Sequence, residues 1–581
     1  MMIRRFKTRE VMVGNVGIGG LNPVRIQSMT NTNTLDTAAT VEQTICLADA
    51  GCEMVRITAQ GVREAENLAV IKNELFKRGY QIPLIADIHF NPKAAEVAAG
   101  IVEKVRINPG NYTDRNRGKT SFTDREYLEA TDRIIEKIYP LIEICKKNNT
   151  ALRIGSNHGS ISERIVHRFG NTPAGMVEAA MEFVRICREL DFHQLVLSMK
   201  ASNVRVMVMA TRLVVKQMME EGMDYPIHLG VTEAGDGLDG RIKSAAGAGA
   251  LLYDGIGDTL RVSLTENPVN EIPVARMICN HFSYENAYSD NPFARFFYDP
   301  FTFMKNKSQP VDFPPELKFP VVIGQHTTNT EIAPDLVFDR KDLLHAEKKI
   351  RILPCEDLSE NEAFHNTFVS LNAGQIKHIP AISWNEIPRF AFVALPQTSD
   401  AVDEWQHCFR IFRESGLKAP VILKKKYAET DPEKLAVKAA LDFGPLFIDG
   451  FGEGIWIENE EIQPGMLNDI SFRILQACGA RITQTEYIAC PSCGRTLYDI
   501  QSSLQKIKER TSHLAGLKIG VMGCIVNGPG EMADADYGYV GMGSGKVALF
   551  KGHKMVKKDV DEAVAVDELI ALIRQGGDWH D

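Results

Sequence analysis

The feature that most constrains the fold of this chain is a regular alternation of short β-branched segments and amphipathic segments across residues 21–280. The β-branched segments predict strands, and the segments between them predict helices. Eight such units in roughly 260 residues match the number and size of a (β/α)8 TIM barrel. A doubly wound open sheet is the alternative, but it usually has fewer strands and a different ligand loop. The predicted strands are residues 24–28, 54–57, 84–87, 104–107, 151–154, 194–198, 227–231 and 259–262.

Polar side chains gather at or just beyond the carboxyl ends of these strands. In a barrel all of these ends open into one mouth, where binding and catalytic sites are built. Five of the side chains are basic and would hold a strongly anionic ligand, most naturally a diphosphate, because guanidinium groups pair with phosphate through two hydrogen bonds. Each residue taken alone could instead face water at a strand end. The set is Arg56, Asp87, His89, Arg106, Asn108, Arg153, Asn157, Lys200, Ser202, His228, Glu233, Arg261 and Ser263.

Two segments near the end of the chain carry three cysteines and an acidic residue in a spacing that suits a metal centre. Cys490 and Cys493 form a CxxC pair, Cys524 follows 31 residues later, and Glu531 lies seven residues beyond it. Three thiolates with one oxygen ligand suit an iron–sulfur cluster that has one exchangeable iron. A structural zinc is the alternative, although a zinc ribbon would normally add a second CxxC pair. A thioredoxin-like pair would leave Cys524 and Glu531 without a role.

Composition sets the class and the setting of the chain. Its 581 residues, 44% of them hydrophobic, are too many for one core and predict roughly two to four domains. We find no apolar run long enough to span a bilayer, and the first residues lack the apolar stretch of a signal peptide. The chain has eleven cysteines, an odd number, and all but Cys490, Cys493 and Cys524 are scattered along it. This pattern argues against a disulfide framework and indicates a reducing compartment. The net charge of −9 makes nucleic acid an unexpected partner.

The pattern predicts three domains. Residues 1–281 are expected to form the substrate-binding barrel. Residues 282–466 begin with the loop signals Asn291-Pro292 and Asp299-Pro300 and are expected to form an inserted α/β domain with a structural role. Within this insert, Lys424-Lys425-Lys426 is interpreted as a solvated face. Residues 467–581 are expected to form an α/β domain that holds the cysteines.

The predicted C-terminal domain contains helices at residues 497–510 and 561–574 and strands at 518–522, 537–540 and 547–550. The glycine-rich segment from Gly541 to Lys546 has a superficial likeness to a phosphate loop. It lacks the required context, because Lys546 begins a strand and not a helix. We therefore predict a hairpin turn at this segment.

Eight segments together resemble one known family, the 4-hydroxy-3-methylbut-2-enyl diphosphate synthases of the non-mevalonate isoprenoid pathway. The resemblance covers roughly residues 5–280 and 467–581, and its motifs are long and ordered. The insert is similar to the one in the large three-domain form of plants and some bacteria. The matching segments are residues 86–90 (ADIHF), 106–111 (RINPGN), 153–155 (RIG), 199–202 (MKAS), 228–235 (HLGVTEAG), 257–263 (GDTLRVS), 489–493 (ACPSC) and 523–531 (GCIVNGPGE).

The resemblance implies an iron–sulfur oxidoreductase that opens and dehydroxylates 2-C-methyl-D-erythritol 2,4-cyclodiphosphate to (E)-4-hydroxy-3-methylbut-2-enyl diphosphate. Two electrons would reach the substrate through a [4Fe-4S] cluster, with ferredoxin or flavodoxin as the donor. The implied location is the cytoplasm in a bacterium or the plastid stroma in a plant. The implied cluster ligands are Cys490, Cys493, Cys524 and Glu531, of which Glu531 gives way to a substrate oxygen. The implied substrate-binding residues are Arg56, Asp87, His89, Arg106, Arg153, Asn157, Lys200, Ser202, His228, Arg261 and Ser263.

Three acidic or titratable residues at the mouth have less settled roles. Glu233 is predicted to donate a proton to the departing hydroxyl, since a carboxyl shielded on a Gly-flanked loop could have a raised pKa. The alternative is a structural carboxylate that pairs with an arginine. Asp87 and His89 could either orient arginines or touch substrate.

Two other functions stay open at this point. One is a non-redox barrel transferase that acts on a phosphorylated substrate and carries a structural zinc. The other is an electron-transfer or scaffold protein in which a cluster only relays charge. The sequence does not decide whether the barrel and the cysteine domain meet within one chain or across a homodimer, so a monomer and a homodimer are both possible.

Overall fold

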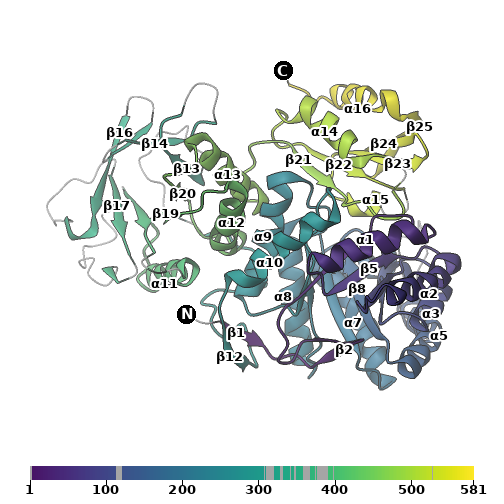
Figure 1. Cartoon of the computed structure of the whole chain (residues 1–581). Helices are drawn as coiled ribbons and strands as arrows, with labels where there is room; N and C mark the ends of the chain where they lie inside the picture. The colour runs from purple at the N-terminus through teal and green to yellow at the C-terminus, as the bar shows by residue number, and fades with distance from the viewer. Residues whose placement is uncertain are drawn as a thin grey trace. The chain divides into compact units, whose positions relative to one another are not determined.

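The chain divides into two compact units in the computed structural model (Figure 1). The barrel–cysteine unit comprises residues 3–244, 251–294 and 484–581, and the insert unit comprises residues 245–250 and 295–483. The structure describes residues 3–112, 121–306, 308, 319–327, 332–339, 342–345, 348–357, 367–372, 374–375, 390–396, 398, 400–496, 498–525 and 528–580.

All eight strands predicted in the N-terminal region are present, and they form one parallel sheet with the order β10-β11-β4-β5-β6-β7-β8-β9. A parallel bridge between Leu197 of β9 and Ile227 joins the two ends of this order. The sheet is therefore closed, and the prediction of a TIM barrel is confirmed. The strands are β4 (Arg25–Met29), β5 (Met54–Thr58), β6 (Leu84–Asp87), β7 (Lys104–Ile107), β8 (Ala151–Asn157), β9 (Leu195–Lys200), β10 (His228–Leu229) and β11 (Thr259–Leu260).

Helices cover the outside of the barrel, as Figure 1 shows for α2, α3, α5 and α7. The helices cover the outer face of the sheet, and the inner face packs on itself in the barrel interior. Strands such as β5 and β8 are therefore buried along their whole length. Local signals fix where helices begin: Thr172 caps α7 and is followed by Pro173, which suits the first helical turn. The helices are α1 (Thr37–Asp49), α2 (Val62–Lys77), α3 (Pro92–Ala99), α4 (Pro109–Tyr112), α5 (Asp124–Asn148), α6 (Glu163–Phe169), α7 (Pro173–Glu189), α8 (Val204–Glu220), α9 (Gly237–Tyr253), η1 (Pro268–Asn270) and α10 (Glu271–His281).

A small hairpin closes the amino-terminal end of the barrel. Strands β2 (Val11–Val13) and β3 (Val16–Ile18) are antiparallel, and Gly14 makes their turn with a positive φ of 59°. Val11, Val13 and Ile18 pack against an apolar set that includes Met54, the first residue of β5. This apolar plug leaves the carboxyl end of the barrel as the open end. A further parallel pair, β1 (Ile3–Phe6) with β12 (Tyr284–Ser289), lies outside the barrel sheet.

The C-terminal part is a five-stranded sheet with three helices, in the order β21-β22-β23-β24-β25. Side chains of α14 and α16 share one core with the sheet, and Met532 and Ala535 pack in a second core. The strands and helices predicted here are present, and so is the hairpin at residues 541–546, where Gly543 pairs with Lys546. The elements are β21 (Glu486–Ala489), α14 (Ile500–Thr511), β22 (Lys518–Met522), α15 (Gly528–Glu531), β23 (Tyr537–Gly543), β24 (Lys546–Lys551), β25 (Lys554–Asp561) and α16 (Glu562–Gly576). Residue 497, the predicted start of the first helix, lies outside the described residues.

The insert unit contains a second closed barrel of mixed strand direction, in the order β13 to β20. The sequence predicted an α/β insert, which is correct, but not its closure into a barrel. Strands β14 and β15 are only four residues long and each includes a charged residue, and β16 carries three, so their strand signal is weak. The elements are β13 (Val321–Gly324), β14 (Leu336–Asp339), β15 (Asp342–His345), β16 (Lys348–Pro354), η2 (Cys355–Asp357), β17 (Thr367–Leu371), β18 (Phe390–Ala394), α11 (Ala401–Glu414), β19 (Val421–Lys426), α12 (Pro432–Ile448), β20 (Gly454–Glu458) and α13 (Pro464–Ala477).

The interpretation of Lys424-Lys425-Lys426 as a solvated face is wrong for two of the three lysines. Lys424 lies 3.6 Å from the centre of the Trp456 ring and forms an ion pair with Glu458 at 2.7 Å. Lys425 forms an ion pair with the buried Asp442 at 2.8 Å. Only Lys426 has a mostly exposed side chain. The first two lysines are held by partners that a local charge pattern cannot reveal.

None of the helices in the described ranges is long and apolar enough to pass through a lipid bilayer.

Candidate active site

A cavity of about 80 Å³ lies at the carboxyl ends of the barrel strands, and residues of the C-terminal sheet form its other wall. Both walls belong to the barrel–cysteine unit of a single chain. The residues predicted from the sequence that line this cavity are Arg56, Asp87, His89, Arg106, Asn157, Lys200, Glu233, Arg261, Ser263, Cys490, Cys493, Cys524 and Glu531.

Four residues of the predicted set, Asn108, Arg153, Ser202 and His228, are buried but do not line the cavity. His228 turns toward the neighbouring strand, where its Nδ1 lies 2.5 Å from Oγ1 of Thr259. A strand pattern shows which side chains face the barrel interior but not how far below the mouth they lie. Arg153 precedes the cavity-lining Asn157 on β8 and lies deeper in the barrel, whereas Ser202 lies in the loop after β9.

Arg106 on β7 makes a dense set of contacts at the cavity. Its Nη1 donates to Oδ1 of Asp87 at 3.2 Å and lies 2.5 Å from Nε2 of His89. Its Nη2 donates to the carbonyl of Gly155 at 3.1 Å and to Oδ1 of Asn157 at 3.0 Å. These contacts come from strands β6 and β8 and from the loop after β6, so the guanidinium plane is fixed before any ligand arrives.

Burial and neighbouring charges set the protonation of Asp87 and His89. Burial lowers the pKa of His89 to about 3, and the positive charge of Arg106 acts in the same direction. The imidazole is therefore neutral at neutral pH and can accept a hydrogen bond from Arg106. Burial alone would raise the pKa of Asp87, but the positive groups around it, Arg56 first, hold that pKa well below its ordinary value. Asp87 is therefore a carboxylate.

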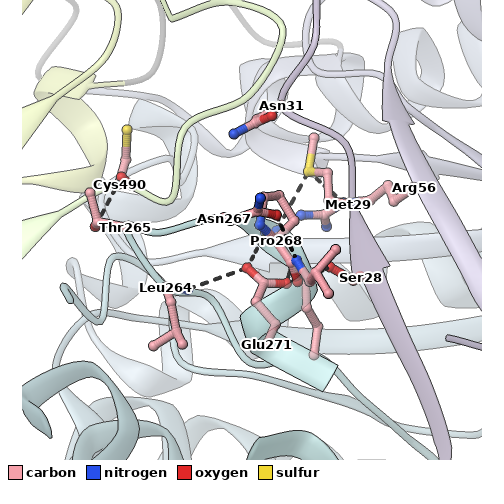
Figure 2. A network of polar contacts seen from close by, with 12 residues as sticks. Ser28, Met29, Asn31, Arg56, Leu264, Thr265, Asn267, Pro268, Glu271 and Cys490 are labelled. Atoms are coloured by element: carbon pink, nitrogen blue, oxygen red, sulfur yellow. Dashed lines mark hydrogen bonds and ion pairs between the residues drawn. The ribbon is translucent and has the colours of Figure 1, made fainter. Parts of the chain in front are cut away.

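Arg261 is held by a residue that the sequence did not single out, Glu271 at the start of α10. The guanidinium donates from Nη2 to Oε1 at 3.0 Å and from Nε to Oε2 at 3.1 Å. Figure 2 shows Glu271 between Ser28 and Leu264; the Ser28 hydroxyl donates to Oε2 at 2.6 Å, and the Leu264 N–H donates to Oε1 at 3.3 Å. An acidic residue in the first turn of the helix after the last barrel strand was the available signal.

Two further cations, Lys104 and Arg153, lie in the barrel interior without lining the cavity. Among the residues that the structure describes, Nε and Nη1 of Arg153 have no hydrogen-bond partner. Burial lowers the pKa of both groups well below the ordinary values, and repulsion from other cations, including Arg56, adds to this effect. The same causes act on Lys200 at the cavity wall. The barrel interior thus concentrates positive charge that a bound anion would offset.

The wall of the cavity that holds Cys490, Cys493, Cys524 and Glu531, here called the cysteine wall, is built at the ends of two neighbouring parallel strands. Cys490 follows β21 and Cys524 follows β22, and the register pairs Ala489 with Val521, so both loops leave the same edge of the sheet. The Gly523 N–H donates to Sγ of Cys490 at 3.2 Å. The Thr265 hydroxyl of the barrel lies 3.2 Å from the Cys490 carbonyl, a contact visible in Figure 2. Residues 526–527 of this motif lie outside the described part of the chain.

The donor set fits the iron–sulfur cluster that the sequence resemblance implies. Cys490, Cys493, Cys524 and Glu531 all face one cavity. Within the described ranges, no group of three or more His, Cys, Asp or Glu side chains is close enough to hold a single metal ion. A tetrahedral zinc needs its sulfurs within roughly 2.3 Å of one ion, whereas a cluster binds each thiolate to a different iron. Three thiols and a carboxylate at one cavity are donors that an iron–sulfur cluster can take.

Glu233 and Glu531 approach the cavity from opposite walls, and their carboxyl groups act on each other electrostatically. Burial and then the charge of Glu531 raise the pKa of Glu233 well above its ordinary value, and burial also raises the pKa of Glu531. Glu233 has a left-handed backbone with a φ of 49°, which is uncommon outside glycine. Such strain persists only where the surroundings impose it, and it is frequent at functional sites.

Arg495 also lines the cavity, although no sequence pattern singled it out. Its Nη2 lies 3.5 Å from Oδ2 of Asp87, so it forms an ion pair between the C-terminal part and the barrel. The only local signal was its position two residues after Cys493.

Comparison with known proteins assigns the chain to a family. Residues 8–276 match the GcpE TIM-barrel domain, and residues 486–575 match the GcpE protein C-terminal domain. A relative from Parabacteroides distasonis, named 4-hydroxy-3-methylbut-2-en-1-yl diphosphate synthase (flavodoxin), is 45% identical over 99% of this chain and 98% of its own length. A relative of the same name from Bacteroides thetaiotaomicron is 46% identical over 98% of each chain. The chain belongs to the 4-hydroxy-3-methylbut-2-en-1-yl diphosphate synthase family.

Membership in this family confirms the resemblance predicted from the motifs, and with it the prediction of an oxidoreductase with an N-terminal TIM barrel. The relatives span the insert as well, since the match covers nearly all of both chains. Among solved structures, 3-dehydroquinate dehydratase from Geobacillus kaustophilus is 12% identical and covers 48% of this chain and 98% of its own, with a TM-score of 0.32.

Proposed function

We propose that this chain reduces 2-C-methyl-D-erythritol 2,4-cyclodiphosphate to (E)-4-hydroxy-3-methylbut-2-enyl diphosphate in isoprenoid precursor biosynthesis. The observation that carries the proposal is one cavity with a cationic barrel wall and a facing wall of Cys490, Cys493, Cys524 and Glu531. The reaction needs electrons delivered to a substrate that carries two phosphates. A cavity with these two walls meets both needs at once.

The cofactor in this proposal is a [4Fe-4S] cluster, with Cys490, Cys493 and Cys524 on three irons and Glu531 on the fourth. When bound, such a cluster supplies electrons one at a time and a Lewis-acidic iron for the substrate oxygen. Carboxylate is a harder ligand than thiolate and exchanges more readily for oxygen. Glu531 therefore marks the corner at which substrate can bind.

The barrel wall binds and orients the cyclic diphosphate. We assign the direct contacts to Arg56, Arg106, Lys200 and Arg261, with Asn157 and Ser263 as hydrogen-bonding neighbours, because all of them line the cavity. Stabilising charge on the departing phosphate is a transition-state interaction, so these residues should affect rate as well as binding.

The remaining predicted substrate-binding residues act from a distance in this proposal. Asp87 and His89 orient Arg106 through the contacts described above. Arg153, Ser202 and His228 lie outside the cavity lining; Arg153 and His228 support the wall from the strands, and Ser202 from the loop after β9.

Glu233 is proposed to donate the proton with which the hydroxyl leaves as water. It lines the cavity opposite Cys490, Cys493 and Cys524, and its left-handed backbone is of the kind that is frequent at functional sites. It forms no arginine ion pair among the described residues, which disfavours the purely structural alternative.

The electron donor is proposed to be flavodoxin, because the relatives carry that word in their names. The relatives are bacterial, which supports a cytoplasmic location. A single chain supplies both walls of the cavity, so a monomer is sufficient for the reaction and a partner copy need not complete the site.

The test is metal analysis and turnover of the full chain purified without oxygen. The proposal predicts about four irons per chain and reduction of the cyclic diphosphate by reduced flavodoxin. A content of about one zinc per chain, with no reduction of the substrate, would favour the non-redox transferase instead. Iron without turnover would favour a protein that only relays electrons.

A further inference from the structure

Arg495 connects the two walls of the cavity. The residue is only 7% exposed, and its Nη2 lies 3.5 Å from Oδ2 of Asp87 on the barrel wall. Asp87 in turn accepts a hydrogen bond from Arg106 at 3.2 Å. A residue of the cysteine wall is thus linked, through one carboxylate, to the arginine that makes the densest contacts on the substrate side.

The turn that carries Arg495 is itself fixed against the barrel. The carbonyl of Gly494 accepts a hydrogen bond from Nε2 of Gln60 at 3.3 Å. A side chain at Gly494 would approach the carbonyl of Thr32 to 2.7 Å, so this turn passes close to barrel backbone. The Cys493 N–H donates to Oγ1 of Thr496 at 3.1 Å, which closes the turn. The guanidinium position is therefore set by both walls together.

The electrostatic neighbours of Arg495 are the groups that the proposed function assigns to the cluster. Apart from Asp87, the ionisable groups whose charge acts on it are Cys493, Cys524 and Glu531. Its Nε is buried and has no hydrogen-bond partner in the part of the chain that the structure describes. A buried donor without a partner is costly, so a ligand or cluster atom that accepts from it would remove that cost.

We propose that Arg495 is a positioning residue that orients Asp87 and Arg106 on the substrate side and holds a permanent positive charge beside the cluster ligands. This inference rests on the proposed function, because it takes Cys493, Cys524 and Glu531 as ligands. A positive charge stabilises the form of a cluster that has gained an electron, and therefore raises its reduction potential. The link to Asp87 also makes diphosphate binding depend on a residue outside the barrel.

The experiment compares Arg495→Met and Arg495→Lys with the wild type as full, anaerobically purified chains. Arg510→Met is the matched control. Arg510 lies on helix α14, which packs on the C-terminal sheet, and it pairs with Asp567 at the surface. Two quantities are measured: the reduction potential, by a redox titration followed by electron paramagnetic resonance, and the affinity for inorganic pyrophosphate, by calorimetry. The second does not depend on electron transfer.

The proposal predicts that Arg495→Met disfavours cluster reduction by about tenfold or more, and a tenfold change corresponds to 59 mV for one electron. It also predicts weaker pyrophosphate binding. Arg495→Lys should recover most of the potential, because the charge is kept, but not the affinity, because the shorter lysine carries a point charge that does not hold Asp87 in the orientation set by the guanidinium. Arg510→Met should change neither.

Failure of this inference is distinguishable from failure of the proposed function. A wild-type chain without iron would overturn the proposed function. A wild-type chain with its cluster, together with an Arg495→Met variant of unchanged potential and unchanged pyrophosphate affinity, would overturn the Arg495 inference alone. If Arg495→Met does not retain iron, the pyrophosphate affinity of Arg495→Lys tests the inference instead. An unchanged affinity in Arg495→Lys would overturn the proposed link to Asp87.

Discussion

Arg261 and Glu271 form a two-point ion pair inside the barrel, with Nη2–Oε1 at 3.0 Å and Nε–Oε2 at 3.1 Å. Arg261 is 3% exposed and Glu271 is 1% exposed, so water screens the pair very little. The pair fixes the guanidinium while Arg261 still lines the cavity. The pair joins the segment that follows β11, the last barrel strand, to helix α10.

Replacing Glu271 with glutamine should destabilise the barrel, because it leaves the Arg261 charge buried without a counter-charge. Removing one partner of a buried pair typically costs about 3–5 kcal/mol. Differential scanning calorimetry would measure the change. Glu285→Gln is the control: Glu285 pairs with Arg4, whose side chain is 62% exposed, and such surface pairs contribute roughly 0–1 kcal/mol. Equal effects of the two substitutions would contradict this reading of Glu271.

Lys104 should be a source of instability that methionine removes. Its side chain is fully buried, its Nζ lies 3.7 Å from Sδ of Met54, and burial holds its pKa well below the ordinary value. Between the folded-state pKa and about 10.5 the unfolded chain binds the extra proton, so unfolding is favoured there, and the penalty shrinks as the pH rises toward about 10.5.

Lys104→Met should therefore raise Tm at neutral pH, by about 2–4 °C for each kcal/mol gained, with a smaller gain at pH 9.5. Thermal unfolding at both pH values checks this prediction. Lys146→Met, on the exposed side of α5, is the control and should leave Tm almost unchanged. A fall in Tm for Lys104→Met would mean that the ammonium has an anionic partner in solution.

How far the sequence could predict the site depends on which physical cue each residue carries. The positions of the barrel strands follow from local β-branched runs, and the convergence of residues such as Asp87 and Arg106 follows from topology, since parallel strand ends open at one mouth. Lys104 could have been found, because it lies two residues before Arg106 on the same inward face. Glu271 and Arg495 could not be assigned from spacing, because their partners are distant in the sequence.

Arg106→Met should strongly reduce turnover, and Arg106→Lys should not restore it. The guanidinium contacts Asp87, His89, Gly155 and Asn157 through a planar set of donors that a single ammonium lacks. We expect kcat/KM to fall roughly 100-fold, or about 2.7 kcal/mol of transition-state stabilisation. Steady-state kinetics with the cyclic diphosphate would measure this. Arg125→Met, whose side chain is 88% exposed, should behave as the wild type.

Glu233→Gln should lower kcat by about 10²-fold while KM changes little, because an amide cannot donate the proton with which the hydroxyl leaves. The amide keeps the size of the side chain, so the cavity wall is preserved. The matched control is Glu64→Gln in the first turn of α2, outside the cavity lining. A Glu233→Gln variant with wild-type kcat would assign the proton transfer to another group.

Glu531→Cys separates substrate chemistry from electron relay. A fourth thiolate should hold the cluster at least as firmly, so iron content is expected to stay near four per chain. Turnover should be lost, because thiolate does not give way to a substrate oxygen as carboxylate does. Iron analysis, cluster absorbance and turnover are measured on the same preparation, with Glu562→Cys at the start of α16 as a control for the added thiol. Retained iron with retained turnover would mean that substrate is reduced without binding at that corner, and the cluster would then only pass electrons.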